Sequence, residues 1–326
     1  SLPAFSQPAI SPDAPKPNIL LILADDLGYG DIGCYGATGI KTPNIDQLAS
    51  EGVRFTDAHS PGAVCQPTRY AILSGNYFMH ARRKGKFTLY FHEDQVTLPG
   101  LLKSAGYRTA CIGKWHLGFG RGEEPDFNKE LKPGPLEIGF DWFFGTPRTH
   151  NEPPFVFVEN HHVVGLDPND PVRIIPHEEV LQRGLKDWGW GLSEGAAKAH
   201  ALCPKDSIDI ILADKAVEWI SKESEKPFFL YLPFLAPHVP IAPAPGFRGT
   251  SHAGSYGDYI QQLDACVGKV LDALESEGLV DNTLVIFTSD NGAVLHADAL
   301  AAGHHANGIL LGQKTDAWEG GHRIPF

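Results

Sequence analysis

The chain has 326 residues, which is long for one domain but within reach of a single large α/β unit. It is 42% hydrophobic and 20% charged, a balance that supports a sizeable core and excludes a disordered chain. Its formal net charge of -12 argues against nucleic-acid binding and against an anionic membrane surface, and no segment reaches the length of a transmembrane helix. An anionic substrate would therefore need a local cluster of cationic side chains.

Strands and helices alternate along the chain. The pattern predicts strands over residues 18–24, 53–58, 107–112 and 228–235, and another from residue 284. It predicts helices over 43–51, 67–74, 98–105, 208–221 and 255–277, with proline opening the first and Thr97 capping the third. Residues from about 120 to 200 are rich in Pro, Gly, His and Trp and show little regular pattern. Such alternation predicts an α/β fold with a large, mostly parallel central sheet and helices on both faces.

The N-terminal residues 1–16 are predicted to form an extended arm, followed by one catalytic α/β domain over 17–326. Five of the first 17 residues are prolines, as in a processed secreted protein or a trimmed chain. The five cysteines fit no zinc-binding spacing. If Cys65 is reserved for chemistry, the other four either form disulfides or remain buried thiols: they are Cys34, Cys111, Cys203 and Cys266.

Two of the predicted strands end in oxygen-bearing side chains. Asp25 and Asp26 follow the first strand, and Asp290 and Asn291 follow the strand that begins at Leu284. Because ligand sites in open α/β sheets lie at the carboxyl ends of the strands, these four side chains are expected to meet. Such a set is typical of a site for one hard divalent cation.

Cys65 precedes a predicted helix, so its sulfur would lie near the positive end of the helix dipole. Taken alone it is as readily a buried structural thiol. Arg69 lies four residues after Cys65, close enough to influence its position. Cationic or titratable groups also follow strands at the same predicted edge: Lys114, His116, His238 and Lys314. Singly, these are ordinary surface lysines or core histidines. Together with a metal they favour transfer of a phosphoryl or sulfuryl group, because cations neutralise the anionic oxygens.

Five ordered motifs resemble the type I sulfatases of the alkaline-phosphatase-like superfamily. The signature C-x-P-x-R stands here as Cys65-Gln66-Pro67-Thr68-Arg69. The other matches are 17–28 around Asp25-Asp26, Gly113-Lys114-Trp115-His116-Leu117-Gly118, Thr288-Ser289-Asp290-Asn291-Gly292, and Lys314 before 318–326. The fourth signature position is threonine where serine is commoner. The family usually continues into a smaller C-terminal subdomain, so we expect that subdomain to be missing or truncated here.

The resemblance implies a specific chemistry and compartment. A formylglycine-generating enzyme would convert Cys65 to formylglycine, whose hydrated aldehyde attacks the sulfur of a sulfate ester. Asp25, Asp26, Asp290 and Asn291 would bind one Ca²⁺ beside the formylglycine. Arg69 and Lys114 would position the nucleophile, and His116 would act as a base on it. His238 and Lys314 would contact the sulfate. The protein would act in a secreted, periplasmic or lysosome-like compartment.

Two other functions stay open at this point. A related phosphohydrolase or phosphonate hydrolase would use the same fold, although typical phosphatases of the superfamily carry two zinc ions with additional His and Asp ligands. A non-catalytic glycan-binding relative would keep Cys65 as a thiol. The single set of oxygen ligands favours one hard metal, and hence sulfate, and the complete set of cations argues against a binding protein.

The substrate is expected to be a sulfated carbohydrate. His304 would either line the substrate pocket or shape its loop, and His59 could be structural. Candidate subsite residues are Arg82, Arg83, His150 and Asn151. Aromatic residues in the irregular segment could stack on sugar rings or belong to the core: they are Trp142, Phe143, Phe144, Trp188 and Trp190.

Overall fold

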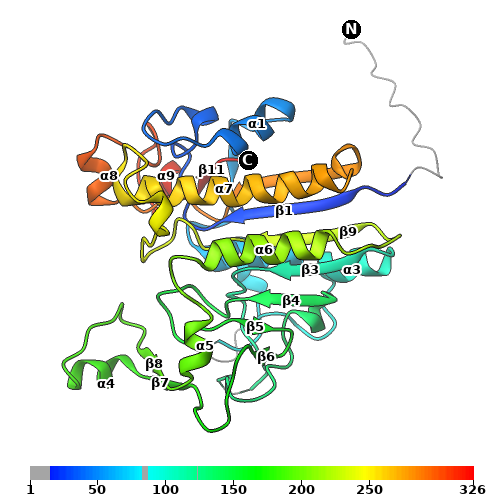
Figure 1. The fold of residues 1–326 in the computed structure, drawn as a ribbon, viewed down its shortest axis with the longest axis vertical. Coiled ribbons are helices and arrows are strands. Elements are labelled where there is room, and N and C mark those ends of the chain that lie inside the picture. Colours follow the sequence, from blue (N-terminus) through cyan, green and yellow to red (C-terminus); the bar gives the residue numbers. More distant parts are fainter. Residues whose placement is uncertain (1–14, 83–86, 123) are drawn as a thin grey trace.

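The computed structural model describes residues 15–82, 87–122 and 124–326. Its centre is a seven-stranded sheet in the order β10-β1-β9-β3-β4-β5-β6 (Figure 1). The strands are β1 (Asn18–Ala24), β3 (Arg108–Ile112), β4 (Trp142–Gly145), β5 (Val158–Glu159), β6 (His162–Val163), β9 (Phe228–Pro233) and β10 (Thr283–Ser289). Neighbours from β10 to β4 are parallel, whereas β5 pairs antiparallel with both β4 and β6. The predicted mostly parallel sheet is therefore confirmed.

Helices cover both faces of this sheet, as predicted. Alternate residues of β1 enter two different cores, because successive side chains of a strand point to opposite faces. Leu20 and Ile22 pack in the core that includes α6 (Ile208–Ile220) and α7 (Gly254–Ser276). Leu21 and Leu23 pack in the other core, with Tyr70 and Leu73 of α2 (Cys65–Ser74).

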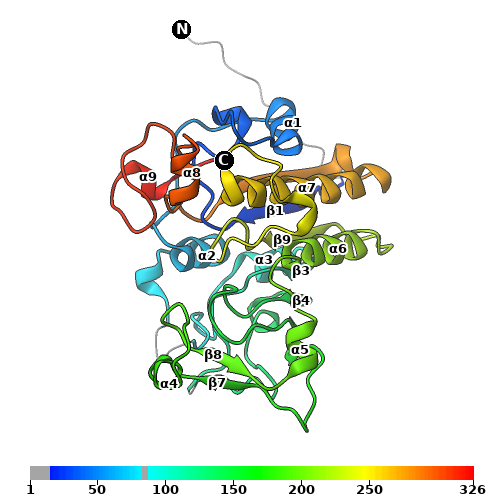
Figure 2. The same ribbon diagram turned by 60° about the vertical axis from the view of Figure 1, so that its left-hand side comes forward.

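Smaller elements surround the sheet. The remaining helices are α1 (Pro43–Glu51), α3 (Leu98–Ser104), α4 (His177–Gln182), α5 (Ala197–Ala201), α8 (Ala297–Ala301) and α9 (Glu319–His322). The 3₁₀ turns are η1 (Gly33–Tyr35), η2 (Phe78–His80), η3 (Leu136–Ile138), η4 (Pro245–Phe247) and η5 (Val280–Asn282). Two small sheets pair β2 (Ala58–His59) with β11 (Arg323–Ile324), and β7 (Arg173–Ile175) with β8 (Leu192–Glu194). Figure 2 shows β7, β8 and α4 together, at the end of the molecule opposite α8 and α9.

Several local predictions hold and two are wrong. Thr97 caps α3 as expected, since its hydroxyl accepts a hydrogen bond from the Gly100 amide at 3.2 Å. The strand predicted over 53–58 is wrong: only Ala58 joins a strand, and Val53 is 78% exposed. The segment from about 120 to 200 holds β4, which is a genuine strand of the central sheet. All five cysteines are free thiols.

The parallel arrangement places five strand ends at one edge of the sheet. Tight backbone packing joins the loops there: a side chain at Gly113 would meet the Pro233 carbonyl at 2.0 Å, and φ at Gly113 is 144°. Glycine is therefore required where β3 leads into the Lys114 loop. Within the described residues, no helix is both long and apolar enough to cross a membrane.

Candidate active site

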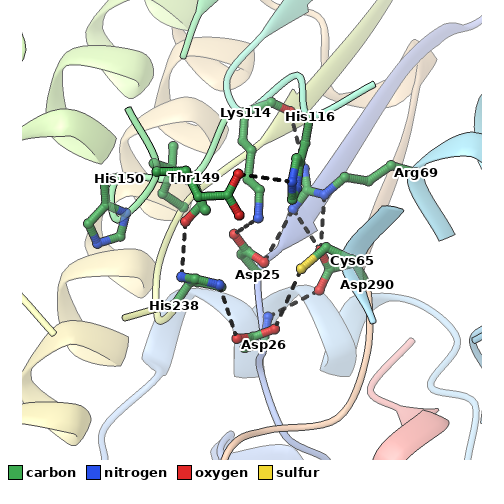
Figure 3. Close-up of polar contacts among 12 residues, drawn as sticks. Asp25, Asp26, Cys65, Arg69, Lys114, His116, Thr149, His150, His238 and Asp290 are labelled. Atoms are coloured by element: carbon green, nitrogen blue, oxygen red, sulfur yellow. Dashed lines mark hydrogen bonds and ion pairs between the residues drawn. The ribbon is translucent and has the colours of Figure 1, made fainter. Parts of the chain in front are cut away.

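The oxygen-bearing side chains that follow β1 and β10 meet at this edge (Figure 3). The two strands are in parallel register, with Ala24 opposite Ser289, so their next residues become neighbours. The Asp26 amide donates to Asp290 Oδ1 at 3.1 Å. Asn291 Nδ2 donates to Asp26 Oδ1 at 2.7 Å. Asp25, Asp26, Asp290 and Asn291 are all buried.

Two oxygens in this group are suited to a cation. Asp25 Oδ1 and Asn291 Oδ1 are buried and accept no hydrogen bond from the described residues. Buried polar atoms are rarely left without a partner, because desolvation then costs free energy. Carboxylate and amide oxygens are also the ligands that Ca²⁺ prefers. These residues therefore fit the hard divalent cation that the sequence predicts.

Three cationic side chains balance the buried carboxylates. Lys114 Nζ lies 2.5 Å from Asp25 Oδ2, and Lys314 Nζ lies 2.7 Å from the Asp26 carboxylate. The Arg69 guanidinium donates twice to Asp290 Oδ2, at 2.7 and 3.0 Å. The local cationic cluster that an anionic substrate requires is thus present in a chain of negative net charge.

The protonation of the carboxylates follows from these neighbours. Burial alone would raise the pKa of Asp25, but the positive charges around it, chiefly those of Lys114 and Arg69, outweigh this effect and hold that pKa well below the usual value. Burial and the adjacent Asp25 raise the pKa of Asp290 to about 7. The site therefore keeps Asp25 ionised and ready to bind a cation.

Cys65 is the first residue of α2, so the helix begins two residues earlier than predicted. Its side chain is buried beside the carboxylates, with Sγ 3.4 Å from Lys314 Nζ and 4.0 Å from Asp26 Oδ1. Burial raises the pKa of the thiol, and Asp25 and Asp290 raise it further against the opposing effect of Lys114. The helix N-terminus does not make this cysteine a thiolate, and the unmodified side chain is a weak nucleophile at neutral pH.

Two histidines face the same site. His238 Nδ1 lies 2.6 Å from the Val239 carbonyl, which only accepts, so this nitrogen carries the proton. The other nitrogen, Nε2, lies 3.7 Å from Asp26 Oδ2. His116 Nδ1 is buried without a hydrogen-bond partner in the described chain, and its Nε2 lies 3.8 Å from Glu152 Oε2. Burial lowers the pKa of both histidines, so both are neutral bases.

Two of the site residues have unusual backbone conformations. Asp26 and His116 adopt positive φ values of 64° and 58°, in the left-handed region that side chains other than glycine rarely occupy. Such strain gathers where the surrounding structure fixes a side chain for function. At His116 it directs the ring from the end of β3 toward the site (Figure 3).

Other predicted site residues lie outside this cluster. His304 is buried, with Nε2 2.7 Å from Asp31 Oδ1. His59 lies 3.3 Å from Glu319 on α9. His150 Nε2 donates to the Pro240 carbonyl at 2.8 Å, and Arg82 donates to the Arg121 carbonyl at 3.0 Å. Arg83 lies outside the described residues, and Asn151 lines a pocket with Trp188.

The aromatic candidates divide into core and pocket residues. Phe143 and Phe144 are buried in the two cores, and Trp142 packs against Phe144 with ring centroids 6.1 Å apart. Trp190, in contrast, lines a pocket together with Cys65. The stacking role considered for all five aromatic residues is therefore excluded by burial for Phe143 and Phe144.

The sequence interpretation missed Glu152 and Thr149. Both follow β4, and Thr149 Oγ1 lies 3.0 Å from His238 Nδ1. The signal was the apolar run at residues 142–144 before a polar loop, which the same strand-end argument would have placed at the active edge.

Comparison with known proteins agrees with this geometry. The sulfatase family model matches residues 17–326. An N-acetylgalactosamine-6-O-sulfatase of Bacteroides thetaiotaomicron is 41% identical over 95% of this chain, and a mouse steryl-sulfatase is 35% identical over 98%. A solved 6S-sulfatase structure from glycosaminoglycan metabolism in B. thetaiotaomicron superposes with a TM-score of 0.88 at 41% identity, covering 95% of this chain and 71% of that one.

These matches show an α/β fold of the sulfatase type. The chain belongs to the sulfatase family, as its motifs predict. It spans 67% of the length of the bacterial relative and 58% of the mouse one.

Proposed function

We propose that this chain is the catalytic part of a calcium- and formylglycine-dependent sulfatase that removes sulfate from a carbohydrate. The observation that carries the proposal is the position of Cys65. Its side chain is buried within 3.4 Å of Lys314 Nζ, against carboxylates that leave buried oxygens free for a cation. The bacterial relative named for N-acetylgalactosamine 6-O-sulfate supports a sulfated amino sugar as the substrate.

In this proposal, Asp25, Asp26, Asp290 and Asn291 hold the Ca²⁺. When bound, the cation supplies Lewis-acid polarisation of a sulfate oxygen. The hard oxygen ligands support calcium, and the position of Cys65 beside Asp26 supports a formylglycine that would lie near the metal. A formylglycine-generating enzyme is the required partner, because the buried, protonated thiol is a weak nucleophile by itself.

The charge and protonation state of Arg69, Lys314 and His116 suit each of them to a different role. Arg69 donates to Asp290 and to the Lys114 carbonyl, so it fixes the loop that carries Lys114 and His116. Burial would lower the pKa of Lys314, but the neighbouring carboxylates of Asp26 and Asp25 raise it, so Lys314 keeps its positive charge and can bind sulfate oxygens. His116 has a buried, unpartnered Nδ1 that can accept a proton from the nucleophile.

His238 completes the sulfate site. Its protonated Nδ1 is held by the Val239 carbonyl, which leaves Nε2 on the side of Asp26. A sulfate ester is anionic and only accepts hydrogen bonds, so His238 would contact it in the protonated form, which the negative charge of bound sulfate favours. Its Nε2–H would then donate to a sulfate oxygen or give its proton to the leaving oxygen. His238 therefore contacts the sulfate together with Lys314.

The test begins with the state of Cys65. The chain is co-expressed with a formylglycine-generating enzyme, and the peptide containing Cys65 is weighed by mass spectrometry. We expect the mass of the aldehyde or its hydrate. A thiol that persists beside an active maturation enzyme would contradict the mechanism and favour a non-catalytic glycan-binding protein.

The matured protein is then assayed on N-acetylgalactosamine 6-sulfate and on phosphate monoesters, with Cys65→Ala as the inactive control. Release of sulfate that stops with a chelator and returns with Ca²⁺ is the expected result. Faster release of phosphate would instead support a phosphohydrolase. We also propose export from the cytoplasm, which fractionation of cells carrying the full gene tests.

A further inference from the structure

A pocket beside Cys65 has one aromatic and one polar wall. The pocket has a volume of about 370 Å³, and this lies within the range of about 300–1,000 Å³ that is usual for small-molecule sites. Trp190 and Tyr90 stand among its aromatic residues, and His116 and Glu152 stand among its polar ones. A ligand in this pocket therefore shares its lining with an indole, a carboxylate and the proposed nucleophile Cys65.

Trp190 is the part of this pocket that the sulfatase chemistry does not use. It lies between α4 and β8, far in sequence from every residue of the strand-end cluster, and its side chain is 46% exposed. Trp188, two residues earlier, is 56% exposed but lines a different pocket with Lys186 and Lys205. Two similar indoles on one loop thus face different surroundings, and only one shares a pocket with Cys65.

The chemistry of the walls indicates the shape of the ligand. An exposed indole offers a broad apolar face, and a pyranose ring has a matching face of C–H groups. The hydroxyl and amide groups at the edge of the sugar can donate to the Glu152 carboxylate. A steroid or aryl alcohol has no such edge, so its burial would desolvate Glu152 without replacing the lost hydrogen bonds.

We propose that Trp190 is the stacking wall for the pyranose ring that carries the sulfate. By stacking on the sugar, Trp190 acts as a specificity-determining residue that favours sugar sulfates over aryl or steroid sulfates. This inference rests on the proposed sulfatase function and adds the class of alcohol that the site accepts.

The test compares two sulfates and two tryptophans. The matured wild type, Trp190→Ala and Trp188→Ala are assayed on N-acetylgalactosamine 6-sulfate and on 4-nitrophenyl sulfate. We expect Trp190→Ala to lower the preference for the sugar, measured as the ratio of the two kcat/KM values, by about tenfold, chiefly through KM for the sugar. Trp190→Phe should restore part of the preference, and Trp188→Ala should keep the wild-type ratio.

Three results would overturn the inference. They are an unchanged ratio in Trp190→Ala, an equal fall in Trp188→Ala, and a loss in kcat on both substrates with KM unaltered. Hydrolysis of 4-nitrophenyl sulfate by the wild type establishes sulfatase activity without the sugar, so a failure of Trp190 alone leaves the proposed function standing. A wild type that hydrolyses neither sulfate would contradict both.

Discussion

The molecule buries carboxylates in two different ways. Asp31 is fully bonded: Oδ2 accepts from the Gly28 amide at 2.7 Å and from the Tyr256 hydroxyl at 2.6 Å, and Oδ1 lies 2.7 Å from His304. Asp209 is likewise held, by the Leu235 amide at 2.7 Å and the Tyr259 hydroxyl at 3.1 Å. Asp25 instead faces Lys114 with one oxygen and leaves the other without a hydrogen bond.

The difference separates buried carboxylates that hydrogen bonds within the fold satisfy from Asp25, which has one oxygen without a hydrogen bond among the described residues. Burial raises the pKa of Asp31, and it raises that of Asp209 to about 6, because their main partners are hydroxyl, amide and imidazole groups. At Asp25 the surrounding cations hold the pKa low. An ionised carboxylate with a free buried oxygen is costly in the isolated chain, and that cost is recovered when a cation binds.

The largest expected effect comes from Arg69→Ala, which removes the cation that pairs with both Asp25 and Asp290. Its guanidinium is fully buried between Asp290 and Asp25. We expect the free energy of unfolding to fall by about 3–5 kcal/mol, because the buried Asp290 carboxylate loses its cationic partner and Asp25 loses one of its two. Denaturant unfolding measures this. Lys129→Ala, which removes an exposed ion pair with Asp126, is the control and should leave the midpoint unaltered.

A matched pair of substitutions tests the difference between Asp25 and Asp31. Asp25→Asn should abolish the rise in melting temperature that Ca²⁺ produces in the wild type. Asp31→Asn should keep that rise but lower the baseline stability by about 1–3 kcal/mol, because the new amide group faces a donor that the carboxylate satisfied. Thermal unfolding across a CaCl₂ titration distinguishes the two. An equal response to calcium in both variants would show that the free oxygen of Asp25 does not mark a cation site.

His304→Ala separates the two roles that the sequence leaves open for this residue. Since His304 is bonded to Asp31, we expect a loss of about 1–3 kcal/mol in stability from the unpaired carboxylate. KM for a sugar sulfate should stay within about twofold of the wild type if the contact only supports the fold. A large rise in KM at normal stability would instead show that His304 binds the substrate.

The smallest effect at neutral pH is that of His150, which contributes a pH dependence of stability in acid. Burial lowers the pKa of His150 to about 3, whereas an unfolded histidine titrates near 6.5. Above pH 6.5 both states are neutral, and the native state suffers no penalty. As the pH falls from about 6.5 to about 3, only the unfolded chain takes up this proton, so stability falls by roughly 1 kcal/mol per pH unit.

His150→Gln isolates this contribution, because glutamine can still donate to the Pro240 carbonyl but does not titrate. The difference in unfolding free energy between wild type and variant, measured from pH 7 to pH 4, should change by the same roughly 1 kcal/mol per pH unit below pH 6.5. A constant difference across that range would show that His150 does not titrate as its burial implies.

The sequence predicted the parts of the fold and site that depend on local pattern. The apolar runs of β1 and β10 predict strands of a parallel sheet, so their ends could be placed together from the sequence. The expected full burial holds for most of β1, whereas β10 is an edge strand in which Leu284 is 52% exposed. The placement of the two strand ends brings Asp25, Asp26, Asp290 and Asn291 to one place, as the structure does. The functional roles of these residues stay predictions until the experiments above are made.

What the sequence did not predict depends on contacts between distant residues. The interpretation missed β4, whose run Trp142-Phe143-Phe144 stands in a segment rich in turn-forming residues, and Glu152 was missed with it. The apolar alternation near Val53 suggested a strand, yet Val53 and Phe55 line an exposed apolar groove beside β10. Nothing local links His304 to Asp31, which lie 273 positions apart.

The left-handed backbone at Asp26 and His116 has a consequence for engineering. Each such residue costs about 1–3 kcal/mol unless the surrounding structure compensates, and glycine at either position would relieve the strain. At Asp26 this gain is cancelled, because glycine would leave the Lys314 ammonium and the Asn291 amide without their partner. A screen that selects only for heat resistance would therefore favour glycine at position 116. It would remove the base that we propose for the reaction, so the most thermostable descendants would be the least useful as hydrolases.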